Sequence, residues 1–240
     1  MKVIGECLNT MAYSRVKDAV SDRNEEYIID TAREMINHGA HYIDVHARNL
    51  EDMIWLVETV SQLRHPVSVD HSDPEILVRC MEYGEVKLVN SINCERTHIF
   101  EQAHNFGVDV IALLHNCDPD TVLKAAEEAG YRRTIYFDPV VMPMSVSPEE
   151  PEKLLSRHLE LKRRGLHTVA GISNISYGMP EGSALKAVLL VMLMNQGLDA
   201  AIVNPSEMLW YIRAFQALKD ASGRETMNYI KTYRSLSGRE

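Results

Sequence analysis

The feature that most constrains the fold is a regular alternation of short apolar runs and longer segments with helical periodicity, repeated eight times in 240 residues. Short apolar runs bounded by turn residues are typical of buried strands, whereas apolar residues spaced three and four apart are typical of helices. The connections are short, and none is a linker rich in Pro, Gly or Ser. Such alternation predicts a parallel sheet, because each pair of parallel strands needs a crossover helix.

The eight predicted strands are Lys2–Gly5, His41–Val45, Val67–Val69, Val86–Val89, Asp109–Leu114, Thr134–Phe137, Thr168–Ala170 and Asp199–Val203. Each of them is followed closely by a polar residue or by residues typical of a turn. Six helices are predicted from periodicity, at Asn24–His38, Leu50–Leu63, Thr97–Phe106, Pro148–Arg164, Gly182–Gln196 and Ser206–Ala221. Two more follow Asp-Pro pairs, at Asp73-Pro74 and at Asp118-Pro119, because Asp caps a helix and Pro suits its first turn.

Eight such units predict an α/β protein with one domain, residues 1–240, folded as a single (β/α)8 TIM barrel. An open doubly wound sheet is the structural alternative. Its usual marker is missing, because no G-x-G-x-x-G follows the first strand.

Composition narrows the class of partner. Lys+Arg 25 against Asp+Glu 34 gives a net charge of -9, which argues against nucleic acid or an anionic membrane as a partner. No apolar run approaches the length of a membrane span, and the N-terminus lacks a signal pattern, so we expect a cytoplasmic protein. The four cysteines, Cys7, Cys80, Cys94 and Cys117, show no C-x-x-C spacing, and we expect reduced thiols.

Polar residues gather where the predicted strands end, which is where barrels carry their sites. They are Glu6, Asn9, Asp44, His46, Asp70, His71, Asn90, Asn93, His115, Asn116, Asp138, Ser173, Asn174, Ser176 and Asn204. Any one of them alone is more simply explained as a helix cap or turn former. As a set, carboxylates and amides with few cations suit a flat, neutral heterocycle that offers both N–H donors and acceptors. Phosphate substrates are disfavoured, since no glycine-rich cradle or basic cluster accompanies these positions.

At these residues the chain resembles the pterin-binding barrel family, and within it the methyltetrahydrofolate:corrinoid-protein methyltransferases. The matching stretches run in order along nearly the whole chain, and they are Ile4-Gly5-Glu6 with Asn9, Val69-Asp70, Val89-Asn90-Ser91 with Asn93-Cys94-Glu95-Arg96, Phe137-Asp138-Pro139 with Pro143, Gly171 to Ser176 with Gly178-Met179-Pro180, and Gly197 to Ile202. Together they are specific, although each alone would be a weak signal.

The resemblance implies a methyl transfer between N5 of tetrahydrofolate and the cobalt of a corrinoid carried on a partner protein. It implies that Asp70, Asn90 and Asp138 hold the pterin ring and that Asn174 is the catalytic residue beside N5. Glu6, Asn9, Gly171 and Ser176 are further expected folate contacts, and candidate ligand or corrinoid contacts are His46, Asn93, His115, Asn116, Met144 and Met179. No metal bound by this chain is expected, and the family suggests a homodimer. The direction of transfer stays open, and it would run toward tetrahydrofolate in a catabolic demethylase system.

The chain also departs from the family pattern. Cys7 stands where relatives commonly have an arginine, and Glu181-Gly182 stands where they have Asn-Arg, so contacts with the folate tail or the partner are expected to differ. In the related dihydropteroate synthases a lysine occupies the position of Asn174 and a basic element follows the last strand, where this chain has Val203-Asn204-Pro205.

Three alternatives remain open at this point. A zinc-dependent TIM-barrel hydrolase would use His46, His71 and His115, and a folate-binding protein without catalysis would keep the pterin residues alone. A dihydropteroate-synthase-like enzyme is the third. The Asp44-x-His46 pair also resembles the start of a corrinoid-binding signature, but Asn49 stands where that signature has Gly, and we expect the corrinoid on a partner.

Overall fold

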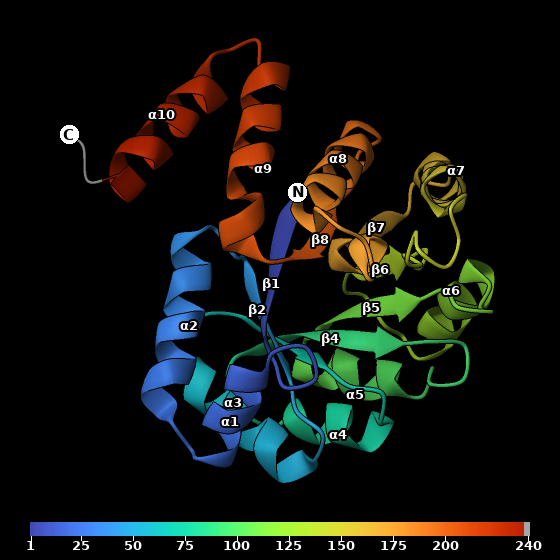
Figure 1. Cartoon of the computed structure of the whole chain (residues 1–240). Coiled ribbons are helices and arrows are strands. Elements are labelled where there is room, and N and C mark those ends of the chain that lie inside the picture. The colour runs from blue at the N-terminus through green and yellow to red at the C-terminus, as the bar shows by residue number, and fades with distance from the viewer. Residues whose placement is uncertain (238–240) are drawn as a thin grey trace.

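The computed structural model describes residues 1–237 and forms a closed barrel of eight parallel strands in chain order (Figure 1). The strands are β1 Lys2–Asn9, β2 Tyr42–His46, β3 Val67–Asp70, β4 Val86–Ile92, β5 Asp109–Leu113, β6 Ile135–Asp138, β7 His167–Gly171 and β8 Ala200–Val203. The barrel closes where Ile4 of β1 pairs with Ile202 of β8. The predicted (β/α)8 barrel is therefore confirmed.

Helices surround the barrel and cross between its strands. They are α1 Ser14–Ser21, α2 Glu25–Asn37, α3 Leu50–Ser61, α4 Pro74–Cys80, α5 Ile99–Phe106, α6 Pro119–Glu128, α7 Glu150–Arg163, α8 Gly182–Asn195, α9 Pro205–Lys219 and α10 Arg224–Ser237, with a 3-10 turn η1 at Ile172–Ser176. The Asp-Pro signals mark helix starts as predicted, because Asp73 and Asp118 accept hydrogen bonds from the backbone N–H groups of Glu75 and Asp120.

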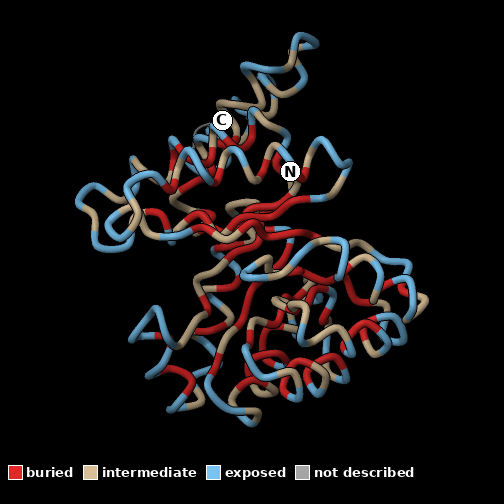
Figure 2. The backbone as a smooth tube through the Cα atoms, turned by 90° about the vertical axis from the view of Figure 1, so that its right-hand side faces the viewer, coloured by how far each residue is buried: buried red, intermediate tan, exposed pale blue. Residues whose placement is uncertain are grey.

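Two helices were not predicted. Helix α1 lies in the connection between β1 and α2, where only one helix was expected, and α10 follows the last predicted unit. Helix α10 contains no buried residue and packs on α9, so that the two form a hairpin that projects from the barrel (Figures 1 and 2). Neither was expected, because a pattern of eight strand-then-helix units requires one helix in each connection and none after the eighth unit.

The core has two parts, and Figure 2 shows the strands as its buried centre. Inside the barrel, side chains from different strands form one cluster, consisting of Ile4, Tyr42, Leu88, Ile111, Tyr136, Val169, Ala200 and Ile202. Between the strands and the helices lies a larger apolar layer. Met208, Leu209 and Ile212 of α9 belong to the buried core, as its periodicity predicts, whereas Leu218 is 87% exposed.

The expectation of four reduced cysteines was wrong. Cys94 and Cys117 form a disulfide, whereas Cys7 and Cys80 are free thiols. The two paired cysteines lie on the loops that follow β4 and β5, which are neighbouring strands of the barrel. Sequence spacing did not reveal the pair because 23 residues separate the cysteines, and only the closed barrel brings the two loops together.

Within residues 1–237, no helix combines the length and the apolar character that crossing a membrane requires.

Candidate active site

A cavity of about 560 Å³ opens at the carboxyl ends of the strands. Its polar residues come from six strands or the segments just after them, and they are Glu6, Asn9, Asp44, Asp70, Asn90, Ser91, Asp138, Ser173 and Asn174. Two tyrosines, Tyr13 and Tyr177, lie at its wall, with Leu113, Pro143 and Ile202 as apolar contacts. No lysine, arginine or histidine is among the described residues that line this cavity.

The cavity is built by the two-residue period of the strands. Side chains that alternate along a strand point to the same face, so the residue two positions after an inward core residue also points into the barrel. The inward core residues Ile4, Tyr42, Leu88, Ile111, Tyr136 and Val169 are each followed two positions later by a cavity residue, namely Glu6, Asp44, Asn90, Leu113, Asp138 and Gly171. The interior therefore changes from an apolar floor to a mainly polar layer in a single step along the barrel axis.

The strand register places the pterin-binding candidates at one level. Asp70 pairs directly with Asn90 across β3 and β4, and Leu113 pairs with Asp138 across β5 and β6. Gly171 pairs with Ile202. The residues that the family resemblance assigned to the pterin thus come together, although they lie far apart in the sequence.

Two carboxyls, Glu6 and Asp70, lie on the same side of the cavity without a cation between them. Burial raises the pKa of Asp70 to about 7, and the neighbouring charge of Glu6 acts in the same direction. Burial also raises the pKa of Glu6, against the hydrogen bond that the Ser173 hydroxyl donates to it and the attraction of Lys186. Burial therefore favours the protonated form of both carboxyls, and the charge of Glu6 adds to this effect at Asp70.

Asp44 is the most enclosed of the acids in this layer. It is 5% exposed, and the hydroxyl of Ser68 donates a hydrogen bond of 2.5 Å to its Oδ1. Burial raises its pKa well above the ordinary value and the charge of Asp70 adds to this, while the hydrogen bonds from Ser68 and Asn90 act against it. Asp44 therefore fixes the orientation of the Asn90 amide at the wall of the cavity.

Asp138 stands opposite in the barrel and is 8% exposed. Burial raises its pKa to about 6, while the N–H of Val140, which donates a bond of 2.8 Å, and the charge of Arg157 lower it. Val140 has a φ of 65°, a conformation that a β-branched residue rarely adopts. Arg157 donates to the Val140 carbonyl at 2.9 Å, so both ends of this residue are held and the loop is fixed beside the carboxylate.

Asn174 lies on η1, directly after β7. Its side-chain amide makes no hydrogen bond to any residue in 1–237, and it is exposed in the cavity. Gly171 is its neighbour at the cavity wall, since a Cβ at Gly171 would lie in ordinary contact with Asn174 Nδ2, at 3.5 Å. The amide is thus free to donate to, or accept from, a bound molecule.

Other predicted contacts lie outside the cavity. Ser176 donates its hydroxyl to the carbonyl of Ser173 at 3.2 Å, and Asn93 accepts from the N–H of Glu95 at 3.0 Å. Further residues that do not line the cavity are His46, His115, Asn116, Met144 and Met179. Asn9 does line it, although its Oδ1 also accepts from the backbone N–H groups of Met11 and Ala12.

The histidines are not gathered as the zinc alternative requires. His46 and His71 stack with ring centroids 5.6 Å apart, while His115 is exposed on a different loop. Within residues 1–237 no group of three or more His, Cys, Asp or Glu side chains has an arrangement that could hold a metal ion. This arrangement does not favour the hydrolase hypothesis.

The sequence did not reveal Tyr13 or Tyr177 as cavity residues, nor that Asp44 is buried and orients the Asn90 amide. The position of Asp44 in the cavity could have been predicted, because it follows an inward-facing apolar residue near a strand end, as Asp138 does. The position of Tyr13 could not, since the connection that carries it contains the unpredicted α1. Loop residues reach a site through the tertiary path of the chain, which local periodicity does not encode.

The geometry agrees with what comparison with known proteins shows. A model of the family described as "Pterin binding enzyme" matches residues 5–129. The chain belongs to this enzyme family. A methylcorrinoid:tetrahydrofolate methyltransferase from Eubacterium limosum is 30% identical over 98% of this chain and 96% of the relative. A methionine synthase from Mycobacterium leprae is 26% identical over 86% of this chain, which corresponds to only 20% of that larger protein.

Solved structures agree on the fold. Dihydropteroate synthase from Yersinia pestis with a pterine-sulfa conjugate superposes with a TM-score of 0.72 at 18% identity, covering 92% of this chain and 94% of that one. The synthase from Thermus thermophilus gives a TM-score of 0.64 at 21% identity, covering 80% and 87%. At these identities the likeness is one of fold. The resemblance to the pterin-binding barrel family is confirmed.

Proposed function

We propose that this protein transfers a methyl group between N5 of tetrahydrofolate and the cobalt of a corrinoid carried on a partner protein. The observation that carries the proposal is the cavity itself. It holds several carboxyls, several amides and no cation among the described residues, in a chain that resembles a methylcorrinoid:tetrahydrofolate methyltransferase over 98% of its length. A homodimer, which the family resemblance implies, belongs to the same proposal, as does the cytoplasmic location expected from the sequence.

A pterin suits this layer of side chains. Its ring edge offers adjacent N–H donors, and carboxylates accept such pairs more strongly than neutral groups do. Asp70 and Asp138 supply acceptors from opposite sides of the barrel, and Asn90, held by Asp44, supplies an amide that can both donate and accept. The carboxyls are enclosed before ligand arrives, so binding does not need to order them.

Methyl transfer is assisted by a polar side chain that can form a hydrogen bond with N5 of the folate. When N5 attacks the methyl group of methyl-Co(III), the carbon–cobalt bond breaks, its electron pair stays on cobalt as Co(I), and N5 gives its proton to solvent. In reverse, Co(I) attacks the methyl group, and the departing nitrogen gains electron density and a proton. An amide hydrogen bond that strengthens at N5 as this charge develops stabilises the transition state. Asn174, with its free amide, is the residue for this role.

The direction we propose is toward tetrahydrofolate, in accordance with the name of the Eubacterium limosum relative, a methylcorrinoid:tetrahydrofolate methyltransferase. A dihydropteroate-synthase-like activity is the weaker alternative. This alternative is supported by the fold alone. The synthases are expected to have a lysine at the position of Asn174, and no basic side chain lines the cavity among the described residues. A cavity without a cation does not favour a phosphate-bearing substrate.

Calorimetric titration with tetrahydrofolate, followed by incubation with methylcob(III)alamin as a free corrinoid probe, tests the proposal. We expect saturable folate binding and the formation of 5-methyltetrahydrofolate with a matching loss of methylcobalamin absorbance. Absence of folate binding would refute the pterin site. Binding without transfer, to this probe or to methylated corrinoid proteins, would instead identify a folate-binding protein without catalysis.

Asn174→Ala is expected to lower the rate of methyl transfer about tenfold while folate binding changes by less than about threefold. The loss of one hydrogen bond to a developing charge costs roughly 1–3 kcal/mol, and this bond is made mainly in the transition state. Steady-state kinetics at saturating folate measure the effect. Asn105→Ala on the exposed side of α5 is the matched control and should leave both quantities unchanged. A normal rate in Asn174→Ala would remove this residue from the mechanism.

A further inference from the structure

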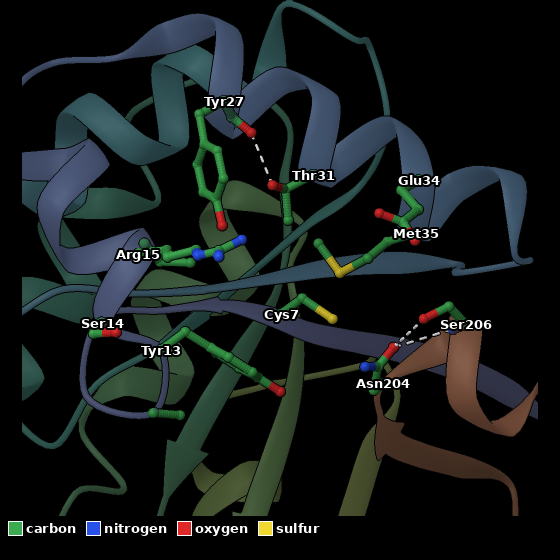
Figure 3. A pocket seen from close by; sticks show the side chains of 12 residues that line it. Cys7, Tyr13, Ser14, Arg15, Tyr27, Thr31, Glu34, Met35, Asn204 and Ser206 are labelled. Atoms are coloured by element: carbon green, nitrogen blue, oxygen red, sulfur yellow. Dashed lines mark hydrogen bonds between the residues drawn. The ribbon is translucent and has the colours of Figure 1, made fainter.

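A second cavity, of about 430 Å³, lies outside the barrel wall next to the candidate active site. Figure 3 shows it between the end of β1, the helices α1 and α2 and the start of α9. Its lining is largely apolar or aromatic, from Cys7, Val16, Tyr13, Tyr27 and Met35. Polar groups stand at its edges, from Arg15, Thr31, Glu34, Asn204 and Ser206. The proposed function does not use this space.

The two cavities adjoin each other. Ala12 and Tyr13 line both of them, and both residues belong to the connection between β1 and α1. Burial raises the pKa of the Tyr13 hydroxyl, and the charge of Glu6 acts in the same direction. Glu6 belongs to the active-site cavity and Cys7 to the second one, so the Tyr13 side chain stands at the border between them.

The second cavity contains the cation that the first one lacks. Arg15 makes no hydrogen bond or ion pair with any residue in 1–237, and its guanidinium points into the cavity toward the Tyr27 hydroxyl (Figure 3). Glu34 lies across the cavity, close enough to Cys7 to contribute to the raised pKa of the thiol. The space thus offers a free guanidinium at one end, apolar walls and a carboxylate at the opposite side.

Position 7 helps to keep this space open. Cys7 is partly buried at the centre of the view in Figure 3, and burial followed by the charges of Glu6 and Glu34 raises its pKa to about 12, so the thiol is neutral. The small thiol lines the cavity without filling it, and Arg15 supplies a guanidinium from α1.

We propose that this cavity binds the p-aminobenzoyl-glutamate tail of the folate, with the benzoyl ring against the apolar walls and a glutamate carboxylate on Arg15. The inference rests on the proposed function, because it places the tail relative to a pterin held in the neighbouring cavity. A folate joins a neutral heterocycle, an aromatic ring and a dicarboxylate in that order. The chain presents a cation-free cavity, an aromatic border at Tyr13 and a free guanidinium in the same order. A planar guanidinium is the preferred partner of a carboxylate.

The test compares tetrahydrofolate with 6-methyltetrahydropterin, which lacks the tail, by calorimetric titration of the full chain. We expect the wild-type protein to bind tetrahydrofolate about tenfold more tightly, the scale of one charge-assisted hydrogen bond at a partly exposed site. Arg15→Gln should remove most of this advantage and leave the affinity for 6-methyltetrahydropterin unchanged. Arg15→Lys should restore part of it, and Glu34→Gln should preserve or increase it, since it removes an opposing charge.

Lys17→Gln is the matched control, because it removes a positive charge from the same helix at a residue that does not line this cavity. It should leave both affinities unchanged. Equal affinity of the wild-type protein for the two ligands, or an advantage that survives in Arg15→Gln, would overturn the tail site while the pterin site stands. Failure of the wild-type protein to bind either ligand would refute the proposed function itself.

Discussion

Replacing Asp138 by asparagine is expected to weaken the binding of tetrahydrofolate about a hundredfold at a pH of about 8. The carboxylate is buried, its pKa is about 6, and in mildly alkaline solution it is ionised in the free protein. A charge-assisted hydrogen bond contributes roughly 1.5–3 kcal/mol, and the substitution also turns an amide N–H toward the N–H groups of the pterin. The asparagine keeps an oxygen for the N–H of Val140, so the loop after β6 should hold its conformation.

Calorimetry with tetrahydrofolate measures this loss, and thermal unfolding of the free variant checks that the fold is intact. Asp18→Asn, an exposed position on α1, is the matched control and should bind folate like the wild-type protein. A folded Asp138→Asn protein with an affinity within about threefold of the wild-type value would show that Asp138 does not hold the pterin.

The same carboxylate gives folate binding a pH dependence. Because the ligand N–H groups need an ionised acceptor, affinity should fall as the pH drops through about 6, where Asp138 takes up a proton. The pKa of Asp70, about 7, should extend the decline upward. The Asp138→Asn variant should lose the part of the decline near pH 6. A wild-type affinity that stays constant from about pH 8 to about pH 5.5 would contradict the assignment.

Replacing Asp70 by asparagine should stabilise the free protein at about pH 8, by on the order of 4 kcal/mol in the free energy of unfolding. The pKa of Asp70 is about 7 in the folded protein and about 4 in an unfolded chain. Between these values the folded state binds more protons than the unfolded state, so this group makes stability fall as pH rises from about 4 to about 7. Above that range the enclosed charge is fully destabilising, and the neutral amide removes it.

Urea unfolding of wild-type and Asp70→Asn protein at about pH 8 and about pH 4.5 measures this effect. We expect a clear gain at the higher pH that largely disappears at the lower one, because Asp70 is then protonated in the folded wild-type protein. The variant should also bind folate more weakly, since stability and function make opposite demands on a buried charge. An equal difference in stability at both pH values would show that Asp70 is not held at a raised pKa.

Much of the fold could be predicted because the signals are local. Asp73-Pro74 and Asp118-Pro119 marked helix starts correctly, and the alternation of strands and helices leaves few arrangements besides a barrel. Helices α1 and α10 were missed. Both lie outside the pattern of one helix per strand from which the helices were predicted.

Much of the candidate site was also predictable, because inward-facing polar residues at strand ends are a sequence pattern. Asp70, Asn90 and Asp138 stand at strand ends, and the barrel brings them into one layer. Their raised pKa values were not predictable. These depend on the depth of burial and on which acids face one another, as Glu6 and Asp70 do from distant parts of the chain.

Local patterns in the chain were enough to predict the order of strands and helices, the polar residues at the strand ends and the family, since period, caps and motifs are properties of neighbouring residues. The folded structure was needed to show that Cys94 meets Cys117, that Tyr13 stands between two cavities and that Arg15 faces the second of them with no partner among residues 1–237. These relations join segments that are distant in the chain. Closure of the barrel fixes them, and no local pattern records them.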